Sequence, residues 1–229
     1  MSTPSIAGNL EAVRRRVAAA AERAGRRPSE VVVVAVSKTF PAALLREALE
    51  AGVEALGENR AQELREKAPL VGERARWHFV GRLQTNKVRH VVGVAELIHS
   101  VDRLGLAEAI SRRARALGIT QDVLVEVNVA GDPDKGGARP ADAAALAAAV
   151  ACLEGVRLRG LMTMPPWPED PEDSRPVYRA LAELGAAVAE AVPGASELSM
   201  GMTRDFEVAV EEGATLVRIG EAIFGPRNA

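Results

Sequence analysis

Several kinds of residue and segment are scarce in this sequence of 229 residues. Cys152 is its only cysteine, which excludes an internal disulfide and a cysteine-rich zinc site. No apolar run reaches the roughly 18 residues that a membrane-spanning helix needs, and the start of the sequence lacks the apolar stretch of a secretory signal. The formal net charge of −2 argues against a general nucleic-acid-binding protein. We therefore expect a cytoplasmic protein that binds neither membranes nor nucleic acid.

Lysine and aromatic residues are scarce as well. Aromatic residues make up 3% of the chain, so the core must consist mostly of alanine, valine and leucine. Lysine and arginine together number 29, but only Lys38, Lys67, Lys87 and Lys135 are lysines. Any primary amine with a special chemical role is therefore one of these side chains. Cys152 lies in an alanine-rich apolar segment, and we expect its thiol to be buried and inert.

The dominant pattern along the chain is an alternation of strand-like and helix-like segments. Residues 31–36 are a β-branched run that is too apolar for a half-exposed strand, which is typical of a parallel sheet buried on both faces. An amphipathic segment at about 5–24 predicts an extra N-terminal helix before it. The predicted strands are 31–36, 53–58, 77–83, 96–101, 122–129, 156–164, 197–202 and 214–220.

Eight strands, each followed by a helix or a helical turn, predict an α/β protein with a (β/α)8 barrel. The alternative is an open doubly wound sheet, which is disfavoured because no G-x-G-x-x-G motif follows the first strand. The composition shows no linker, so we expect residues 1–229 to form a single domain.

Lys38 is the most informative residue, because active sites in such barrels lie at the C-terminal ends of the strands. Strand alternation places it on the same face as Val32, Val34 and Val36. If this face is the barrel interior, desolvation favours the neutral amine, which can form a Schiff base. The structural alternative is a rim lysine that only solvates the end of the strand.

The loops after the seventh and eighth strands, 199–203 and 220–222, give a second signal. Barrels frequently bind phosphate between these two loops. The first loop offers the Ser199 hydroxyl and a helix N-terminus, and the second offers Gly220, whose backbone can approach a ligand closely. Two turns with glycines for geometry alone would look the same. Together with an amine across the barrel mouth, these loops suggest a phosphorylated aldehyde as the ligand.

Arg218 gives a third signal, since it shares a strand face with Leu216 and Gly220. An arginine that points into a barrel needs a partner, because an unpaired buried charge is costly. That partner is either an inward carboxylate such as Glu126 or a heterocyclic nitrogen of a ligand. The histidines, His78, His90 and His99, have no spacing typical of metal ligands, and we expect them to be structural.

Long motifs follow one another in order along nearly the whole chain. They are VAVSKT (34–39), GENRAQE (57–63), WHFVGRLQTNK (77–87), HSVD (99–102), GLMTM (160–164), LSMGMTRD (198–205) and VRIGEAIFG (217–225). In this order they resemble the pyridoxal 5′-phosphate homeostasis protein family, the YggS/PROSC-like proteins. This family is related to the N-terminal barrel of alanine racemase.

The resemblance implies the fold-type III barrel of alanine racemase, with pyridoxal 5′-phosphate (PLP) held on Lys38 as an internal aldimine. It implies that the phosphate is held by Ser199 and by backbone N–H groups near Met200, Gly220 and Glu221. It further implies that Arg218 faces the pyridine nitrogen and that Asn59 lies beside the ring. The implied cofactor-binding residues are Lys38, Asn59, Ser199, Met200, Arg218, Gly220 and Glu221.

The family resemblance also implies a function without a catalytic reaction: binding PLP, buffering it and delivering it to PLP-dependent apoenzymes, with effects on amino-acid and keto-acid balance. We expect a monomer. The alternatives are a fold-type III amino-acid racemase and a Schiff-base aldolase for a phosphorylated sugar. Racemisation needs an acid/base on each face of the substrate carbon. In alanine racemase a tyrosine of a second domain supplies one of them, whereas Tyr178, the only tyrosine here, lies in a predicted helix away from the rim.

Overall fold

The computed structural model describes residues 5–226 and contains a closed barrel of parallel strands. The strands follow one another around the ring in chain order, and the last pairs with the first. They are β1 (Val32–Val36), β2 (Ala55–Glu58), β3 (Trp77–Phe79), β4 (Leu97–Val101), β5 (Gln121–Glu126), β6 (Val156–Met162), β7 (Glu197–Ser199) and β8 (Leu216–Ile219). This confirms the predicted (β/α)8 barrel.

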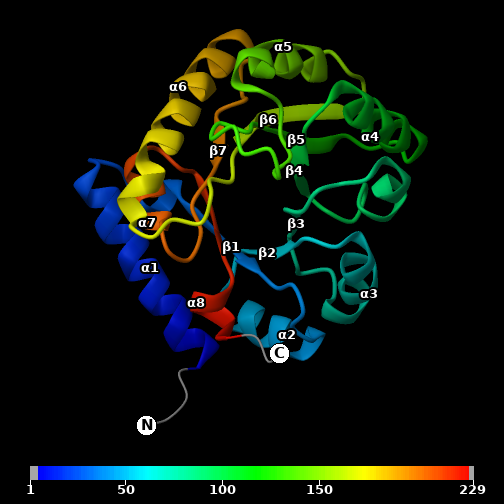
Figure 1. Cartoon of the computed structure of the whole chain (residues 1–229). Coiled ribbons are helices and arrows are strands. Elements are labelled where there is room, and N and C mark those ends of the chain that lie inside the picture. The colour runs from blue at the N-terminus through cyan, green and yellow to red at the C-terminus, as the bar shows by residue number, and fades with distance from the viewer. Residues whose placement is uncertain (1–4, 227–229) are drawn as a thin grey trace.

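Helices surround the ring of strands (Figure 1). The predicted N-terminal helix is α1 (Ile6–Arg23), and Ser5 caps it by accepting a hydrogen bond from the N–H of Gly8. The outer α-helices are α2 (Ala42–Glu50), α3 (Ala61–Val71), α4 (Leu104–Ala116), α5 (Pro140–Ala151), α6 (Arg175–Ala191), α7 (Phe206–Glu211) and α8 (Glu221–Phe224). Short 3-10 helices are η1 (Pro28–Glu30), η2 (Thr85–His90) and η3 (Pro171–Ser174), so a 3-10 helix follows β3.

β3 and β7 are among the strands that end earlier than the sequence predicts, and the chain turns sharply after both. β3 ends at Phe79, and a Cβ on Gly81 would lie 2.1 Å from the carbonyl oxygen of Asn59. β7 ends at Ser199, and Gly201 then adopts a positive φ of 92°, which glycine adopts without strain. These turns place the segments after β3 and β7 in loops at the C-terminal end of the barrel.

The apolar core has two layers. Inside the barrel lies a small cluster of Val34, Ala55, Leu97, Leu124, Met162 and Leu216, with Val32 packed against it. Between the strands and the helices lies a much larger cluster to which the alternate β1 residues Val33 and Ala35 belong. The predicted inward face of β1 is therefore confirmed, and the barrel interior above this small cluster is left to polar side chains.

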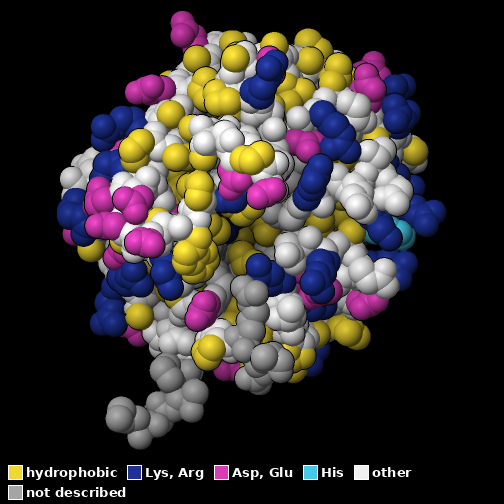
Figure 2. Space-filling model, viewed as in Figure 1, with side chains coloured by type: hydrophobic (Ala, Val, Ile, Leu, Met, Phe, Trp, Pro, Cys, Tyr) yellow, Lys and Arg dark blue, Asp and Glu magenta, His cyan; other side chains and the backbone are white. Residues whose placement is uncertain are grey.

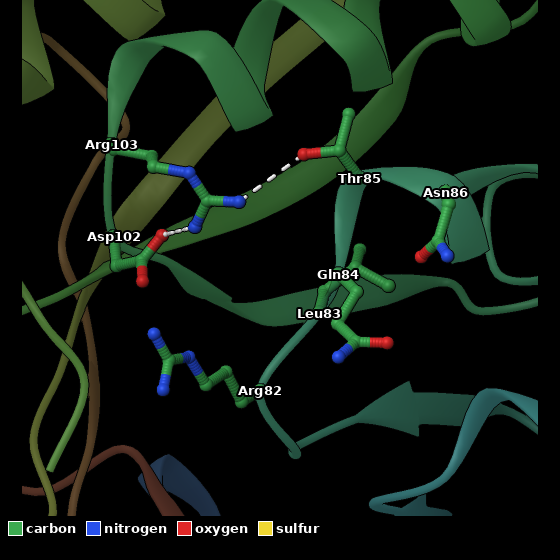
Figure 3. A pocket seen from close by; sticks show the side chains of 7 residues that line it. All are labelled: Arg82, Leu83, Gln84, Thr85, Asn86, Asp102 and Arg103. Carbon is green, nitrogen blue, oxygen red and sulfur yellow. Dashed lines mark hydrogen bonds and ion pairs between the residues drawn. The ribbon is translucent and has the colours of Figure 1, made fainter. Parts of the chain in front are cut away.

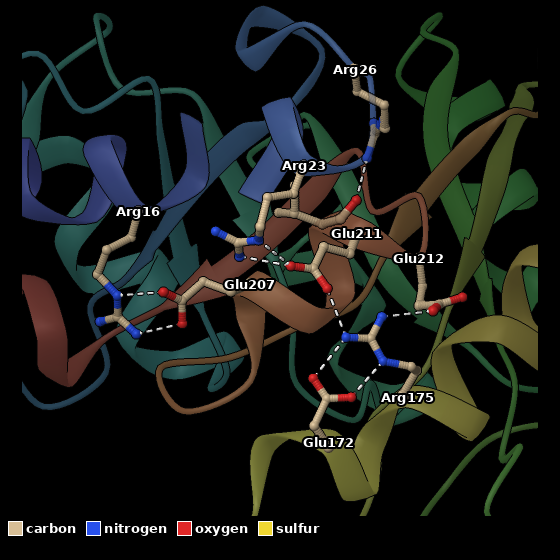
Figure 4. Close-up of polar contacts among 9 residues, drawn as sticks. Arg16, Arg23, Arg26, Glu172, Arg175, Glu207, Glu211 and Glu212 are labelled. Atoms are coloured by element: carbon tan, nitrogen blue, oxygen red, sulfur yellow. Dashed lines mark hydrogen bonds and ion pairs between the residues drawn. The ribbon is translucent and has the colours of Figure 1, made fainter. Parts of the chain in front are cut away.

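The N-terminal helix α1 closes the outside of the barrel by packing on α7 and α8. Figure 4 shows the ion pairs that join these elements: Arg16 pairs with Glu207 at 2.7 Å, and Arg23 pairs with Glu211 at 2.7 Å. Arg175 of α6 also pairs with Glu211, at 2.7 Å, and so links α6 to the same end of α7. Because the arginines are partly exposed, each pair contributes only modest stability.

Two expectations from the sequence concern the outer surface: the absence of a membrane-spanning helix and the burial of the single cysteine. Within residues 5–226, no helix combines the length and apolarity needed to cross a bilayer. Cys152 is exposed, so the expectation of a buried thiol is wrong. The physical reason is its position: α5 ends at Ala151, and Cys152 is the residue after the last helical turn.

Candidate functional site

A cavity of about 580 Å³ lies at the C-terminal ends of the strands. Its volume is in the range of roughly 300–1,000 Å³ that is usual for small-molecule sites. In Figure 2 a hollow is visible near the centre of the face, with basic and acidic side chains around it. The residues that line the cavity include Lys38, Asn59, Arg82, Glu126, Lys135, Thr203, Arg218, Gly220 and Glu221.

Lys38 reaches this cavity from a turn directly after β1. The next residue, Thr39, has a positive φ of 70°, a conformation that is strained for a β-branched residue. Its N–H donates a hydrogen bond of 2.9 Å to the carboxylate of Glu63 on α3. Glu63 thus holds the unusual turn that sets the direction of the Lys38 side chain.

Behind this turn lies an ionic cluster made of Ser37, Glu58, Glu63 and Lys67. The ammonium of Lys67 donates to Glu58 at 2.6 Å, to Glu63 at 2.7 Å and to the carbonyl oxygen of Ser37 at 2.9 Å. The Glu58 side chain is fully buried and also accepts hydrogen bonds from the Ser37 hydroxyl and the Asn59 N–H. Burial raises the pKa of Glu58, and the charge of Lys67 opposes that shift. The cluster therefore ties the ends of β1 and β2 to α3.

The structure distinguishes the lysines by their surroundings. Lys67 uses its ammonium in the cluster just described, and Lys87 is exposed on η2. Lys135 lines the same cavity as Lys38, but its ammonium donates to the carbonyl oxygens of Met164 and Pro165. The sequence placed Lys135 only in a loop, and its arrival at the cavity was not foreseen. Lys38 remains the lysine at the end of an inward strand face.

Arg218 lies on the inward face of β8 and is only 5% exposed. Its guanidinium donates to the Ser199 hydroxyl at 2.5 Å and to the carbonyl oxygen of Thr163 at 2.9 Å. It makes no ion pair with Glu126, nor with any other carboxylate in residues 5–226. A guanidinium has five N–H donors, so Arg218 keeps donors for an acceptor in the cavity that it lines.

A chain of buried hydrogen bonds continues from Arg218 through the barrel interior. The Ser199 hydroxyl lies 2.8 Å from Nδ1 of His99, and Nε2 of His99 lies 3.0 Å from Nδ1 of His78. Arginine can only donate, so the Ser199 hydroxyl oxygen accepts from Arg218, while the tautomers of the two rings set the direction of the bonds to His99 and His78. Burial lowers the pKa of His78 to about 4 and that of His99 well below its usual value. Both rings are therefore neutral at pH 7, as this chain requires.

This arrangement differs from the expectation for Ser199 and Met200. Ser199 is fully buried, and its hydroxyl is engaged by Arg218 and His99. The N–H of Met200 donates to the carbonyl oxygen of Leu216 across the β7–β8 ladder. In the described chain neither residue is part of the cavity lining. Because β7 ends at Ser199, the alternation of the strand turns this hydroxyl inward and below the rim.

Thr203 is the residue of this loop that does line the cavity, and the sequence argument missed it. Asp205 holds the loop in place: its carboxylate accepts from the Met202 N–H at 2.7 Å, the Ser174 hydroxyl at 2.9 Å and the Tyr178 hydroxyl at 2.7 Å. Asp205 is at the N-cap position of α7, where aspartate is common, and an aspartate directly before a predicted helix was the available signal.

Gly220, Glu221 and Asn59 line the cavity as expected. A Cβ on Gly220 would lie 3.1 Å from the carbonyl oxygen of Val36, so this close approach requires glycine. α8 begins at Glu221, and the first N–H groups of a helix have no partner within it. The side-chain oxygen of Asn59 is buried without a hydrogen bond from the described chain, so it can accept a hydrogen bond from a ligand in the cavity.

The arrangement fits PLP at three points. Lys38 brings a primary amine to the cavity, Arg218 has unused donors for an unprotonated ring nitrogen, and the side-chain oxygen of Asn59 has no hydrogen bond from the described residues. Backbone N–H groups and the Thr203 hydroxyl surround the space between the loops after β7 and β8, where barrels bind phosphate. No group of three or more metal-ligating side chains occurs in the part of the chain that the structure describes.

Comparison with known proteins agrees with this class of fold and site. The family model of the alanine racemase N-terminal domain matches residues 8–228. The chain is 46% identical to the pyridoxal phosphate homeostasis protein of Aquifex aeolicus, over 96% of this chain and 97% of that protein. It is 44% identical to the protein of the same name in Pseudomonas aeruginosa, over 100% of this chain and 97% of that protein.

Solved structures agree as well. PipY of Synechococcus elongatus with PLP bound is 34% identical, with a TM-score of 0.83 over 96% of this chain and 100% of that chain. Alanine racemase of Clostridium difficile is 15% identical with a TM-score of 0.73, over 98% of this chain and 57% of that chain, which shows the shared fold. The chain is thus a barrel of the alanine racemase N-terminal type. Among such proteins it belongs to the pyridoxal phosphate homeostasis protein family.

Proposed function

We propose that this protein binds PLP in the strand-end cavity and holds it in reserve for PLP-dependent apoenzymes. The observation that carries the proposal is Arg218, a buried guanidinium with unused donors in a cavity that Lys38 enters from β1. PLP supplies an aldehyde that condenses reversibly with a primary amine. The homeostasis proteins named above, and the PLP-bound structure of PipY, support the same ligand. Since the recipients are metabolic enzymes, we place the protein in the cytoplasm as a monomer.

Each residue has a distinct part in this proposal. Lys38 forms the covalent imine bond, Arg218 donates to the ring nitrogen, and Asn59 lies beside the ring. The phosphate lies between the loops after β7 and β8, against Gly220, the N–H of Glu221 and the Thr203 hydroxyl. Ser199 acts through Arg218, which it anchors, and Met200 acts through the backbone ladder that fixes the loop.

The same residues argue for a carrier rather than a racemase. A cationic arginine at the ring nitrogen opposes its protonation, which makes the ring a weaker electron sink. Tyr178, the only tyrosine, is fully buried and donates to Asp205, and burial raises the pKa of its hydroxyl. We therefore propose that conversion of L-alanine by the PLP-loaded protein is much slower than the roughly 1 s⁻¹ at the low end of typical enzymes. Chiral chromatography measures this, with Lys38→Ala as the control.

The decisive experiment is an absorption spectrum of the PLP-loaded protein before and after borohydride reduction, followed by peptide mapping. We expect a visible chromophore that Lys38→Ala abolishes and Lys87→Ala leaves intact. The reduced pyridoxyl group should map to Lys38. Its presence mainly on Lys67, Lys87 or Lys135 would contradict the proposal, and so would a protein that binds no PLP.

A further inference from the structure

Two side chains of opposite charge face the cavity without an ion-pair or hydrogen-bond partner among the residues that the structure describes. Glu126 is only 5% exposed and Arg82 is exposed, and both line the cavity. Neither side chain makes a hydrogen bond or an ion pair with any residue from 5 to 226. Figure 3 shows Arg82 extending towards Asp102, whereas the dashed contacts join Arg103 to Asp102 and to Thr85. Arg82 also lines a second hollow, of about 670 Å³, beside the main cavity.

The position of Glu126 sets it apart from the parts of the site already described. β5 lies four places from β1 in either direction around the ring, so Glu126 lies across the barrel from Lys38. The loop after β5 covers it: a Cβ on Gly136 would lie 3.6 and 3.7 Å from its carboxylate oxygens, and 3.9 Å from an oxygen of Asp102. Asp102 makes an ion pair with Arg103 at 2.5 Å, whereas no lysine or arginine among residues 5–226 makes an ion pair with Glu126.

We propose that Glu126 and Arg82 form a subsite for a free α-amino acid, whose ammonium faces Glu126 and whose carboxylate faces Arg82. This inference rests on the proposed function, since the amino acid is the amine that removes the aldehyde from Lys38. A zwitterion supplies both of the missing partners at once. A buried carboxylate without a partner is costly, and a charge-assisted hydrogen bond to an ammonium offsets that cost.

The exchange balances in atoms and protons. The ammonium of the incoming amino acid first gives a proton to the Glu126 carboxylate, which frees the nitrogen lone pair. A double bond then forms between this nitrogen and the aldehyde carbon, while the double bond from that carbon to Lys38 Nζ breaks. The two protons left on the incoming nitrogen and the proton held by Glu126 end on Lys38 Nζ, which leaves as an ammonium. Burial and the charge of Asp102 raise the pKa of Glu126 to about 7, against the opposing charges of Arg218 and Arg82, so the carboxylate can take and return a proton near pH 7.

The test compares three nucleophiles on the PLP-loaded protein at pH 7.5, by the rate at which each shifts the visible absorption. L-Alanine carries both charges, ethylamine carries only the ammonium, and methoxyamine is uncharged. Glu126→Gln should slow L-alanine and ethylamine about 10- to 100-fold and change methoxyamine less than about twofold. Arg82→Gln should slow L-alanine severalfold and leave ethylamine unchanged. Asp134→Asn, an exposed carboxylate at the same cavity, is the matched control and should change none of the rates.

A second readout uses the protein without cofactor, by titrating L-alanine into ¹⁵N-labelled protein and following backbone amide shifts. Both Glu126→Gln and Arg82→Gln should weaken binding, and a shift should appear at Gly136. If the chromophore never forms on Lys38, the proposed function fails, and this titration still decides the subsite. Equal slowing of all three nucleophiles, or unchanged L-alanine binding in both variants, would overturn the subsite.

Discussion

Replacing Lys67 by methionine should destabilise the protein strongly, although Lys67 takes no part in binding the ligand. Methionine keeps most of the length of the side chain but removes the charge and all three hydrogen bonds of the ammonium. The Glu58 carboxylate is then left fully buried, with only the Ser37 hydroxyl and the Asn59 N–H as donors, each at 3.1 Å.

The size of the loss follows from the burial of the pair. Removing one partner of a buried ion pair costs about 3–5 kcal/mol, because the remaining charge is uncompensated. For a protein of this length such a loss lowers the melting temperature by roughly 6–20 °C. Glu63 adds little to this figure, since its side chain is 18% exposed and water can solvate it. Lys87→Met, at an exposed lysine on η2, should stay within about 0.5 kcal/mol of the parent.

The loss should depend on pH in a defined direction. The pKa of Glu58 is raised in the folded protein, so the folded state binds more protons than the unfolded state above the unfolded pKa of about 4.3. Stability therefore falls as the pH rises through the window between the unfolded and folded pKa values. Removing Lys67 raises the folded pKa of Glu58 further. The deficit of Lys67→Met should then be largest near pH 8 and shrink towards pH 5.

The assay is guanidinium unfolding at pH 5 and pH 8, followed by circular dichroism and by the fluorescence of the buried Trp77. The double variant Lys67→Met/Glu58→Gln should recover most of the loss, because the buried group is then neutral. Three results would refute the reasoning: a loss below about 1 kcal/mol at pH 8, an equal deficit at both pH values, or a double variant no more stable than the single one.

Two further predictions concern the inner network and the phosphate loop. Ser199→Ala should lower both the PLP affinity and the free energy of unfolding, because it leaves Arg218 and His99 with unsatisfied buried groups; the free energy of unfolding should fall by about 1–3 kcal/mol. Thr203→Val should lower only the PLP affinity. If the two variants behave alike in calorimetric binding and unfolding, the different roles proposed for Ser199 and Thr203 are wrong. The pKa of His78, about 4, lies below its unfolded value of about 6.5, so stability should fall by up to roughly 3 kcal/mol as the pH drops through that window. His78→Gln should flatten this part of the unfolding profile, and an unchanged slope would show that His78 is not the group responsible.

The sequence predicts the barrel and two of its functional side chains for a clear physical reason. Strand alternation has a period of two, so the faces of Lys38 and Arg218 follow from their own strands alone. Chain order around a barrel then places β1 beside β8, and the register aligns Val34 with Arg218. No side-chain detail is needed for that step, which is why these two residues could be located without a structure.

The polar chain in the barrel interior could not be predicted in the same way. Alternation places His78, His99 and Ser199 on inward faces, but it does not tell how far along the barrel axis each one lies. That height depends on the stagger between neighbouring strands, which local sequence does not encode. The structure brings all three within hydrogen-bond distance of one another and of Arg218, so that the Ser199 hydroxyl lies between Arg218 and His99.

The ionic cluster around Lys67 depends on contacts between a strand and a helix, which the local sequence does not predict either. Glu63 and Lys67 are four residues apart on α3, a spacing that predicts their pairing along the helix. Their contact with Glu58 depends on how α3 packs against β2, and the hydrogen bond from Thr39 to Glu63 depends on a backbone conformation that threonine rarely adopts. Long-range packing decides both, so no local pattern could have revealed them.

Two networks of polar contacts hold the two side chains that bind PLP in the proposed function. The ionic cluster around Lys67 holds the turn that carries Lys38, and the chain of buried hydrogen bonds through Ser199 holds Arg218. Both side chains are thus fixed by buried structure that does not need to move for release. Each charge-assisted hydrogen bond contributes about 1.5–3 kcal/mol, so binding the ring and the phosphate through several of them makes simple dissociation slow. Exchange at Lys38 breaks only the covalent bond, and the contacts to the ring and the phosphate still have to break before the product leaves. In the proposed function, the charged groups at the cavity mouth therefore act on the first step of delivery, which is the arrival of an amine at Lys38.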